Sequence, residues 1–220
     1  MADAKKGDSF MRQNRMKKCL TTVLSGILVL SLSGCGQTAK LPEEVVNTSL
    51  VVEKDGKVIS YLVNTFDKDF YSLDGLEEMV KNEAEEFNAA HTDTPEEALT
   101  VKTVQALDDG AMVQVVQEFD SADSYAEYND QDLFYGTRVE ALAQGSPVNK
   151  ELVNAADGTP ADPDKLEKAL EKGHLIITNA SAYIYCPYPV LYISEGVVMG
   201  EDGYVDASQS DGVVTILMKK

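Results

Sequence analysis

Hydrophobic and polar residues alternate with a period of about two in several stretches of the chain, the spacing typical of half-buried β-strands. Two of these stretches, "SLVVEKDGKVISYLV" and "VKTVQALDDGAMVQVVQEF", are each interrupted by an Asp-Gly pair, Asp55-Gly56 and Asp109-Gly110. Asp-Gly favours the positive backbone angles of a tight turn. Each stretch therefore predicts a β-hairpin.

Between and after the hairpins, the hydrophobic period lengthens to that of amphipathic helices. In the first such stretch, Leu76, Val80 and Phe87 fall on one side and glutamates on the other. Four helices are predicted, and the residues that mark their starts are Ser72, Ser121, Thr137 and Pro163. Gly145 and Gly173 are expected to end the third and fourth helices.

The C-terminal part after His174 is rich in Ile, Val and Tyr and is interrupted by turn residues, which predicts three or four further strands. We therefore expect an α+β fold, with a mainly antiparallel sheet built from hairpins and about four helices packed largely on one face. Each hairpin is followed by a Phe-Asp pair and a helix start. This repeated pattern fits either a duplicated ββα unit or a chance recurrence of turn residues.

An apolar segment near the N-terminus is too short to span a membrane. It runs for about 14 residues, from Cys19 to Leu32, whereas a helix needs roughly 20 to cross the hydrocarbon core. Small residues follow it, and basic residues precede it, namely Arg12, Arg15, Lys17 and Lys18. This order is typical of a secretory signal.

The signal ends in Leu32-Ser33-Gly34-Cys35, which resembles the lipobox of bacterial lipoproteins. In that family, the cysteine thiol receives a diacylglycerol and the chain is cut before it. The resemblance thus implies that Cys35 is the lipidated N-terminus of a protein held on the outer, extracytoplasmic face of the cell membrane, as in Gram-positive lipoproteins. It extends over only about the first 35 residues.

The predicted organisation is a signal peptide at 1–34, a lipidated N-terminus and tether at 35–47, and a single α+β domain at 48–220. Two aspartates within the first ten residues are unfavourable ahead of the basic part of a signal. Translation is therefore expected to start at Met11 or Met16, which would leave residues 1–10 or 1–15 upstream of the true start.

The chain is strongly acidic, with 37 acidic and 19 basic residues and a net charge of −18. Cleavage after residue 34 would remove six basic and two acidic residues and bring the net charge to about −22. Such a charge repels nucleic acid and anionic lipid head groups. Nucleic acid is therefore excluded as a partner, and a glycan, a peptide or a cation is the expected kind of ligand.

After cleavage, Cys186 would be the one thiol left beside the lipidated Cys35, so no internal disulfide is predicted. In the segment "YIYCPYP", its side chain is expected to point to the same face as Ile184, away from Tyr185. Without a basic neighbour to lower its pKa, Cys186 is expected to be a buried, unreactive thiol.

The motifs of serine hydrolases, zinc proteases, phosphate loops and dinucleotide sites are absent from the sequence, and His91 and His174 lie far apart in it. No catalytic residue, cofactor or metal ligand is therefore predicted. Two groups of acids suggest calcium sites but lack the full loop pattern, which favours a solvated acidic surface. They are Asp202, Asp206 and Asp211, and Asp120, Asp123 and Glu127.

The densest aromatic segment offers one possible binding patch, made of Tyr183, Tyr185, Tyr188 and Tyr192. Rings on an exposed face could stack on sugars or hold a peptide. The alternation of Tyr with Ile favours the other interpretation, in which the rings belong to strands and cover the core.

Together, these patterns lead us to expect a lipid-anchored extracytoplasmic protein that acts as a non-catalytic binding or envelope accessory module. A surface hydrolase that uses paired carboxylates on a glycan or peptide is an alternative. The solute-binding component of a transporter is another, although that class normally has two α/β lobes and a longer chain.

Overall fold

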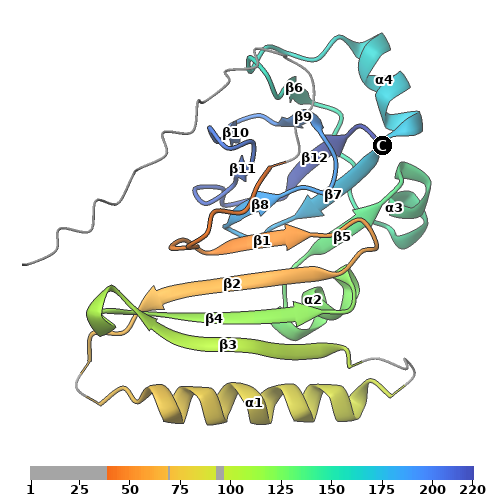
Figure 1. Cartoon of the computed structure of the whole chain (residues 1–220). Coiled ribbons are helices and arrows are strands. Elements are labelled where there is room, and N and C mark those ends of the chain that lie inside the picture. Colours follow the sequence, from red (N-terminus) through yellow and green to blue (C-terminus); the bar gives the residue numbers. More distant parts are fainter. Residues whose placement is uncertain (1–38, 69, 93–96) are drawn as a thin grey trace, which may run out of the picture. The chain divides into compact units, whose positions relative to one another are not determined.

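The computed structural model describes residues 39–68, 70–92 and 97–220 (Figure 1). The chain divides into two units, Met1–Gly34 and Cys35–Lys220, and all described residues belong to the second. The predicted signal peptide and its lipobox lie outside the described residues. None of the helices in the described ranges is long and apolar enough to cross a membrane.

A seven-stranded sheet contains both predicted hairpins, in the order β10-β11-β8-β1-β2-β4-β3. Its strands are β1 (Ser49–Val52), β2 (Val58–Thr65), β3 (Leu99–Leu107), β4 (Met112–Phe119), β8 (Tyr183–Tyr185), β10 (Val198–Met199) and β11 (Val205–Asp206). Within the described part, every neighbouring pair in this sheet is antiparallel except β1 and β8, which are parallel.

A second sheet has five strands, in the order β5-β7-β12-β9-β6, and all its pairs are antiparallel. Its strands are β5 (Leu133–Gly136), β6 (Leu152–Asn154), β7 (His174–Thr178), β9 (Val190–Ser194) and β12 (Val214–Met218). With four α-helices in the described residues, this architecture confirms the predicted α+β class and its mainly antiparallel pairing.

The turns of both predicted hairpins have the expected backbone conformation. Gly56 has a φ of +96° in the β1–β2 turn, where a side chain would be strained. A short 3₁₀ turn, Asp108–Gly110, joins β3 to β4, and Asp109 and Gly110 have φ values of 52° and 93° within it. Both turns therefore form at the predicted Asp-Gly pairs, although in the first pair only Gly56, and not Asp55, has a positive φ.

The four helices are α1 (Leu73–Ala90), α2 (Ala122–Asn129), α3 (Arg138–Gln144) and α4 (Pro163–Lys172). Ser72 and Ser121 cap α1 and α2, each accepting a hydrogen bond from a backbone N–H in the first turn. Thr137 and Glu140 form the predicted capping box of α3. The four predicted helix starts are thus confirmed.

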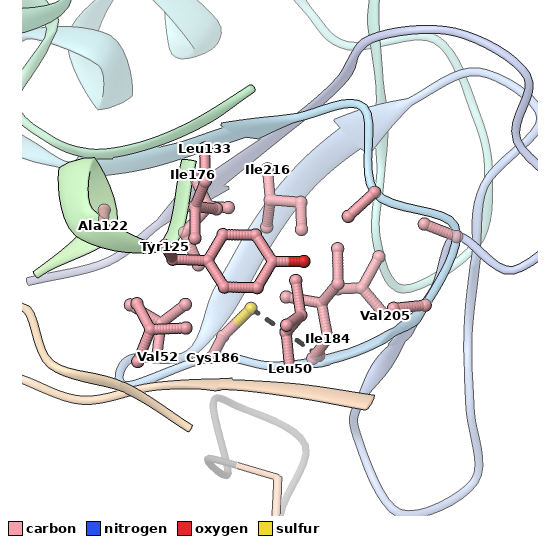
Figure 2. Packing of buried hydrophobic residues seen from close by; sticks show 14 of the residues in the cluster. Leu50, Val52, Ala122, Tyr125, Leu133, Ile176, Ile184, Cys186, Val205 and Ile216 are labelled. Atoms are coloured by element: carbon pink, nitrogen blue, oxygen red, sulfur yellow. Dashed lines mark hydrogen bonds between the residues drawn. The ribbon is translucent and has the colours of Figure 1, made fainter. Parts of the chain in front are cut away.

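The main core lies between the two sheets (Figure 2). It joins Leu50 and Ile184 of the seven-stranded sheet to Ile176 and Ile216 of the five-stranded sheet, all 1% exposed or less. A second cluster covers the other face of the five-stranded sheet, where α3 and α4 contribute Ala141, Leu166 and Leu170. Because both of its faces are covered, β7 is an almost continuous apolar run rather than an alternating one.

Three features differ from the sequence-based expectation. The strands form two sheets rather than one, and the helices do not share one face, since α1 packs on β3 whereas α3 and α4 cover the five-stranded sheet. The C-terminal part after His174 forms six strands rather than three or four, because β8, β10 and β11 are only two or three residues long and show no readable period. Packing also begins before Thr48. Val45, which was expected to lie in the tether, is 7% exposed, and its carbonyl accepts a hydrogen bond from Gln114 Nε2 at 2.5 Å.

Candidate functional site

The structure places the four tyrosines of the predicted patch in three different surroundings. Tyr183 and Tyr185 lie on β8 beside Tyr204, with ring centroids 4.6 and 5.6 Å from it. Tyr188 lies against His174, with centroids 5.8 Å apart. Tyr192 is 8% exposed and belongs to the core cluster under α3 and α4. The four rings are therefore not brought together on one surface.

Cys186 is 5% exposed and packs in the core between the sheets, with Sγ 4.0 Å from the Ile184 carbonyl oxygen (Figure 2). Burial raises the pKa of this thiol to about 12. The predicted burial of Cys186 is confirmed, and its thiolate is disfavoured at neutral pH.

His91 lies at the C-terminal end of α1, stacked on Phe87. Its Nδ1 is 2.8 Å from the Phe87 carbonyl oxygen, and its Nε2 is 3.1 Å from Oε2 of Glu127. The hydrogen bond to the Phe87 carbonyl and then the one to Glu127 raise the pKa of His91. This arrangement links α1 to α2 and is that of a structural ion pair.

His174 is the first residue of β7, and its surroundings shift its pKa in the opposite direction. Its Nε2 accepts from Nζ of Lys220 at 2.9 Å, and its Nδ1 is buried without a hydrogen-bond partner. Burial and then the charge of Lys220 lower the pKa of His174. The two histidines have separate surroundings, and Cys186, the free cysteine of the described residues, is buried and protonated.

These shifts predict opposite pH dependences for the two histidines. The His91 contribution to the free energy of unfolding is complete below the ordinary pKa of 6.5 and is lost as pH rises through the raised value. The contribution of His174 to the free energy of unfolding is complete above its ordinary pKa of 6.5 and is lost as pH falls through its lowered pKa. Urea melts should show His91→Gln costing more at about pH 5.5 than at pH 8, by less than about 1 kcal/mol because the pair is exposed. His174→Gln should show the reverse order.

No group of three or more His, Cys, Asp or Glu side chains within the described ranges is arranged to hold a metal ion. The two acidic groups noted in the sequence therefore provide no such site there. The residues of the lipobox, Leu32 to Cys35, lie outside the part of the chain that the structure describes.

The best candidate for a binding site is a groove of about 710 Å³ between α1 and strands β2 and β4. It is hereafter called the α1 groove. Its walls are mainly apolar, with Leu62 from β2, Val113 and Val115 from β4, and Leu76 and Val80 from α1. The volume lies within the range of about 300–1,000 Å³ that is typical of small-molecule sites.

The groove exists because α1 covers only part of the sheet. Figure 1 shows α1 running alongside β3, the edge strand, and α1 makes most of its contacts with strands there. The 18-residue helix buries only Val80 and Ala84, whereas Met79, which lines the groove, is 49% exposed. The apolar face of β2 and β4 is thus left incompletely covered beside the helix.

Polar side chains line the α1 groove in two groups: Asn64 and Thr65 at the end of β2 with Ser72 at the start of α1, and Gln117 with Tyr128 and Glu83. In the second group, Gln117 on β4 is 2% exposed, and its Oε1 has no hydrogen-bond partner among the described residues. Ser60, directly opposite Gln117 in the β2–β4 register, is 1% exposed and has an equally unpartnered hydroxyl. A buried acceptor without a partner costs free energy, and most buried polar groups in proteins are hydrogen-bonded. The Gln117 end of the groove is therefore expected to bind a ligand or water.

Two further polar side chains line the same end. The Tyr128 hydroxyl on α2 donates to Oε2 of Glu83 on α1 at 3.2 Å. Burial raises the pKa of Tyr128, the neighbouring Gln117 side chain opposes that rise, and Glu83 adds to it. The tyrosine therefore stays a donor to Glu83 at neutral pH, and its proton is already engaged.

None of these groove residues was selected from the sequence as a site residue. Leu76 and Val80 were assigned to the packed side of a helix, and Val115 to an ordinary strand face. One available signal was Gln117 itself, a polar residue in line with Val113 and Val115 on the face that should be apolar.

Comparison of the chain with protein-family models, with curated proteins and with solved structures finds no match. The function of the chain is therefore inferred from the geometry of the described residues and from the motif at Cys35.

Proposed function

We propose that this protein is a lipid-anchored, extracytoplasmic, non-catalytic binding module whose ligand is a small apolar molecule held in the α1 groove. The lipobox-like residues that end in Cys35 support the anchor and the location. The groove supports the binding role.

One observation carries the proposal, namely a mainly apolar groove of about 710 Å³ with a buried, unpartnered acceptor at one end. Small-molecule sites combine apolar walls with a few polar groups that fix the orientation of the ligand. The acidic surface of the chain makes a large anionic partner unfavourable. A small apolar molecule satisfies both conditions.

The hydrolase alternative is less well supported at this site. Paired-carboxylate catalysis needs two acids that face each other across the cleft, about 5–9.5 Å apart. Among the described residues, the lining of the α1 groove contains a single carboxylate, that of Glu83, and its neighbour Tyr128 donates to it. The groove thus has one acid where such chemistry needs two.

Filling the groove tests the proposal. In Leu62→Trp, an indole ring would occupy space beside Val115, because Leu62 is half-buried and lines the groove. The full chain with Cys35→Ala, which carries no lipid to compete, should increase the fluorescence of diphenylhexatriene, an apolar probe without hydrogen-bonding groups. Leu62→Trp should weaken probe binding by about tenfold or more, the loss expected when roughly 1.4 kcal/mol of apolar contact is removed.

Tyr61→Trp is the matched control, since Tyr61 is the neighbouring β2 residue, points to the opposite face of the sheet and does not line the groove. Probe binding should survive this change. Equal binding by both variants and the parent chain would place the probe elsewhere and refute the proposed site.

A further inference from the structure

Among the side chains that line the Gln117 end of the α1 groove, Gln117 and Glu83 offer acceptors, while the unpartnered Ser60 hydroxyl lies opposite Gln117 and is not part of the lining. Gln117 Oε1 is an acceptor without a partner. Glu83 is an acceptor, and the proton of the Tyr128 hydroxyl is already donated to it at 3.2 Å. A ligand that completes this end must therefore bring a hydrogen-bond donor.

We infer, on the basis of the proposed function, that the ligand of the α1 groove is a small amphiphile with an apolar tail and a donor head group, either a hydroxyl or a protonated amine. The tail lies along Leu62, Leu76 and Val115, and the head donates to Gln117 Oε1. Fatty acids and other anionic amphiphiles are excluded.

Charge supports the exclusion of anions. An ionised carboxylate has acceptors only, so it cannot donate to Gln117 and would lie near the Glu83 carboxylate. Transfer of such a head group from water to the Gln117 end is costly, because Glu83 is the one charged side chain among the described residues that line the groove. The net charge of −18 adds long-range repulsion of the same sign. A hydroxyl avoids this repulsion, and an ammonium group turns it into attraction.

Three octyl compounds with different head groups test the inference: octan-1-ol, octylamine and octanoate. Each is added at neutral pH to displace diphenylhexatriene from the full chain carrying Cys35→Ala. The alcohol and the amine should displace the probe at concentrations about tenfold or more below that of octanoate, the factor expected from pairing or failing to pair one buried acceptor. Displacement by octanoate at equal or lower concentration would overturn the donor assignment.

Gln117→Leu identifies the acceptor. The variant should keep probe binding but lose most of the discrimination between octan-1-ol and octanoate, bringing the ratio to within about threefold. Gln105→Leu is the matched control, because Gln105 lies on the other face, where its Nε2 donates to Gln114 Oε1 at 2.9 Å. It should leave the ratio unchanged. If Gln117→Leu does not fold, the order in which the three compounds displace the probe from the parent chain still tests the inference.

Glu83→Gln separates the two donor heads, since it should weaken displacement by octylamine and leave octan-1-ol nearly unaffected. An equal effect on both compounds would show that Glu83 does not recognise the head group by charge. The two failures are distinguishable: a probe that does not bind, or that ignores Leu62→Trp, removes the proposed function. A probe that binds in the groove but is displaced best by octanoate removes only the inference.

Discussion

The variant Cys35→Ala is expected to incorporate no labelled fatty acid and to keep its signal peptide uncleaved at that site. The reason is chemical, since the thiol is the atom that accepts the lipid in the family that Leu32 to Cys35 resemble. Two acyl chains at about 0.8 kcal/mol per buried CH₂ hold a protein firmly, whereas removal of the thiol takes away both chains. Metabolic labelling measures the first effect, and the apparent mass of the chain on a denaturing gel measures the second.

Cys19→Ala is the matched control. Cys19 opens the same apolar segment but is not followed or preceded by the lipobox-like residues, so its loss should leave labelling and cleavage unchanged. Normal labelling of Cys35→Ala would show that the lipid, if there is one, is attached at another residue, and the proposed anchor would be wrong.

The sequence predicts well those features that depend on a few neighbouring residues. Asp55-Gly56 sets a turn through its own backbone preferences, and Thr137 with Glu140 caps a helix through bonds over three residues. These interactions do not depend on the rest of the fold. The hairpins and helix starts could therefore be derived without a structure.

The sequence is less informative where distant segments must meet. β8 is three residues long and pairs in parallel with β1, which lies more than 130 residues earlier in the chain. Nothing in "YIYCPYP" specifies that partner. The division into two sheets with a core between them follows from such pairings, which is why a single sheet was the simplest prediction.

The α1 groove also could not be predicted from the hydrophobic periodicity of the sequence. A helical stripe that includes Leu76 and Val80 predicts that α1 packs on a sheet, but it does not say how much of the sheet the helix covers. In the structure, α1 lies along the edge strand β3, and Leu62 and Leu76 remain only half-buried beside the gap. A binding site that arises from incomplete packing has no motif of its own.

Tyr192→Ala is expected to cost about 3–5 kcal/mol of the free energy of unfolding, as for other core aromatic residues truncated to alanine. The ring is 8% exposed and packs in the cluster beneath α3 and α4, and its backbone pairs with Leu217 in β12. With a denaturant slope of about 2 kcal/mol per molar, the urea midpoint should fall by roughly 2 M.

Tyr183→Ala provides the comparison that tests the aromatic segment as a whole. Tyr183 is half-buried and stacks on Tyr204 with centroids 4.6 Å apart, so its loss should cost only about 0.5–1.5 kcal/mol, the worth of one aromatic pair. If both tyrosines are structural, neither change alters retention on glycans or peptides once the remaining folded fraction is taken into account. Unchanged urea midpoints in both variants, together with lost retention, would instead establish the tyrosines as a binding surface, in spite of their separate surroundings.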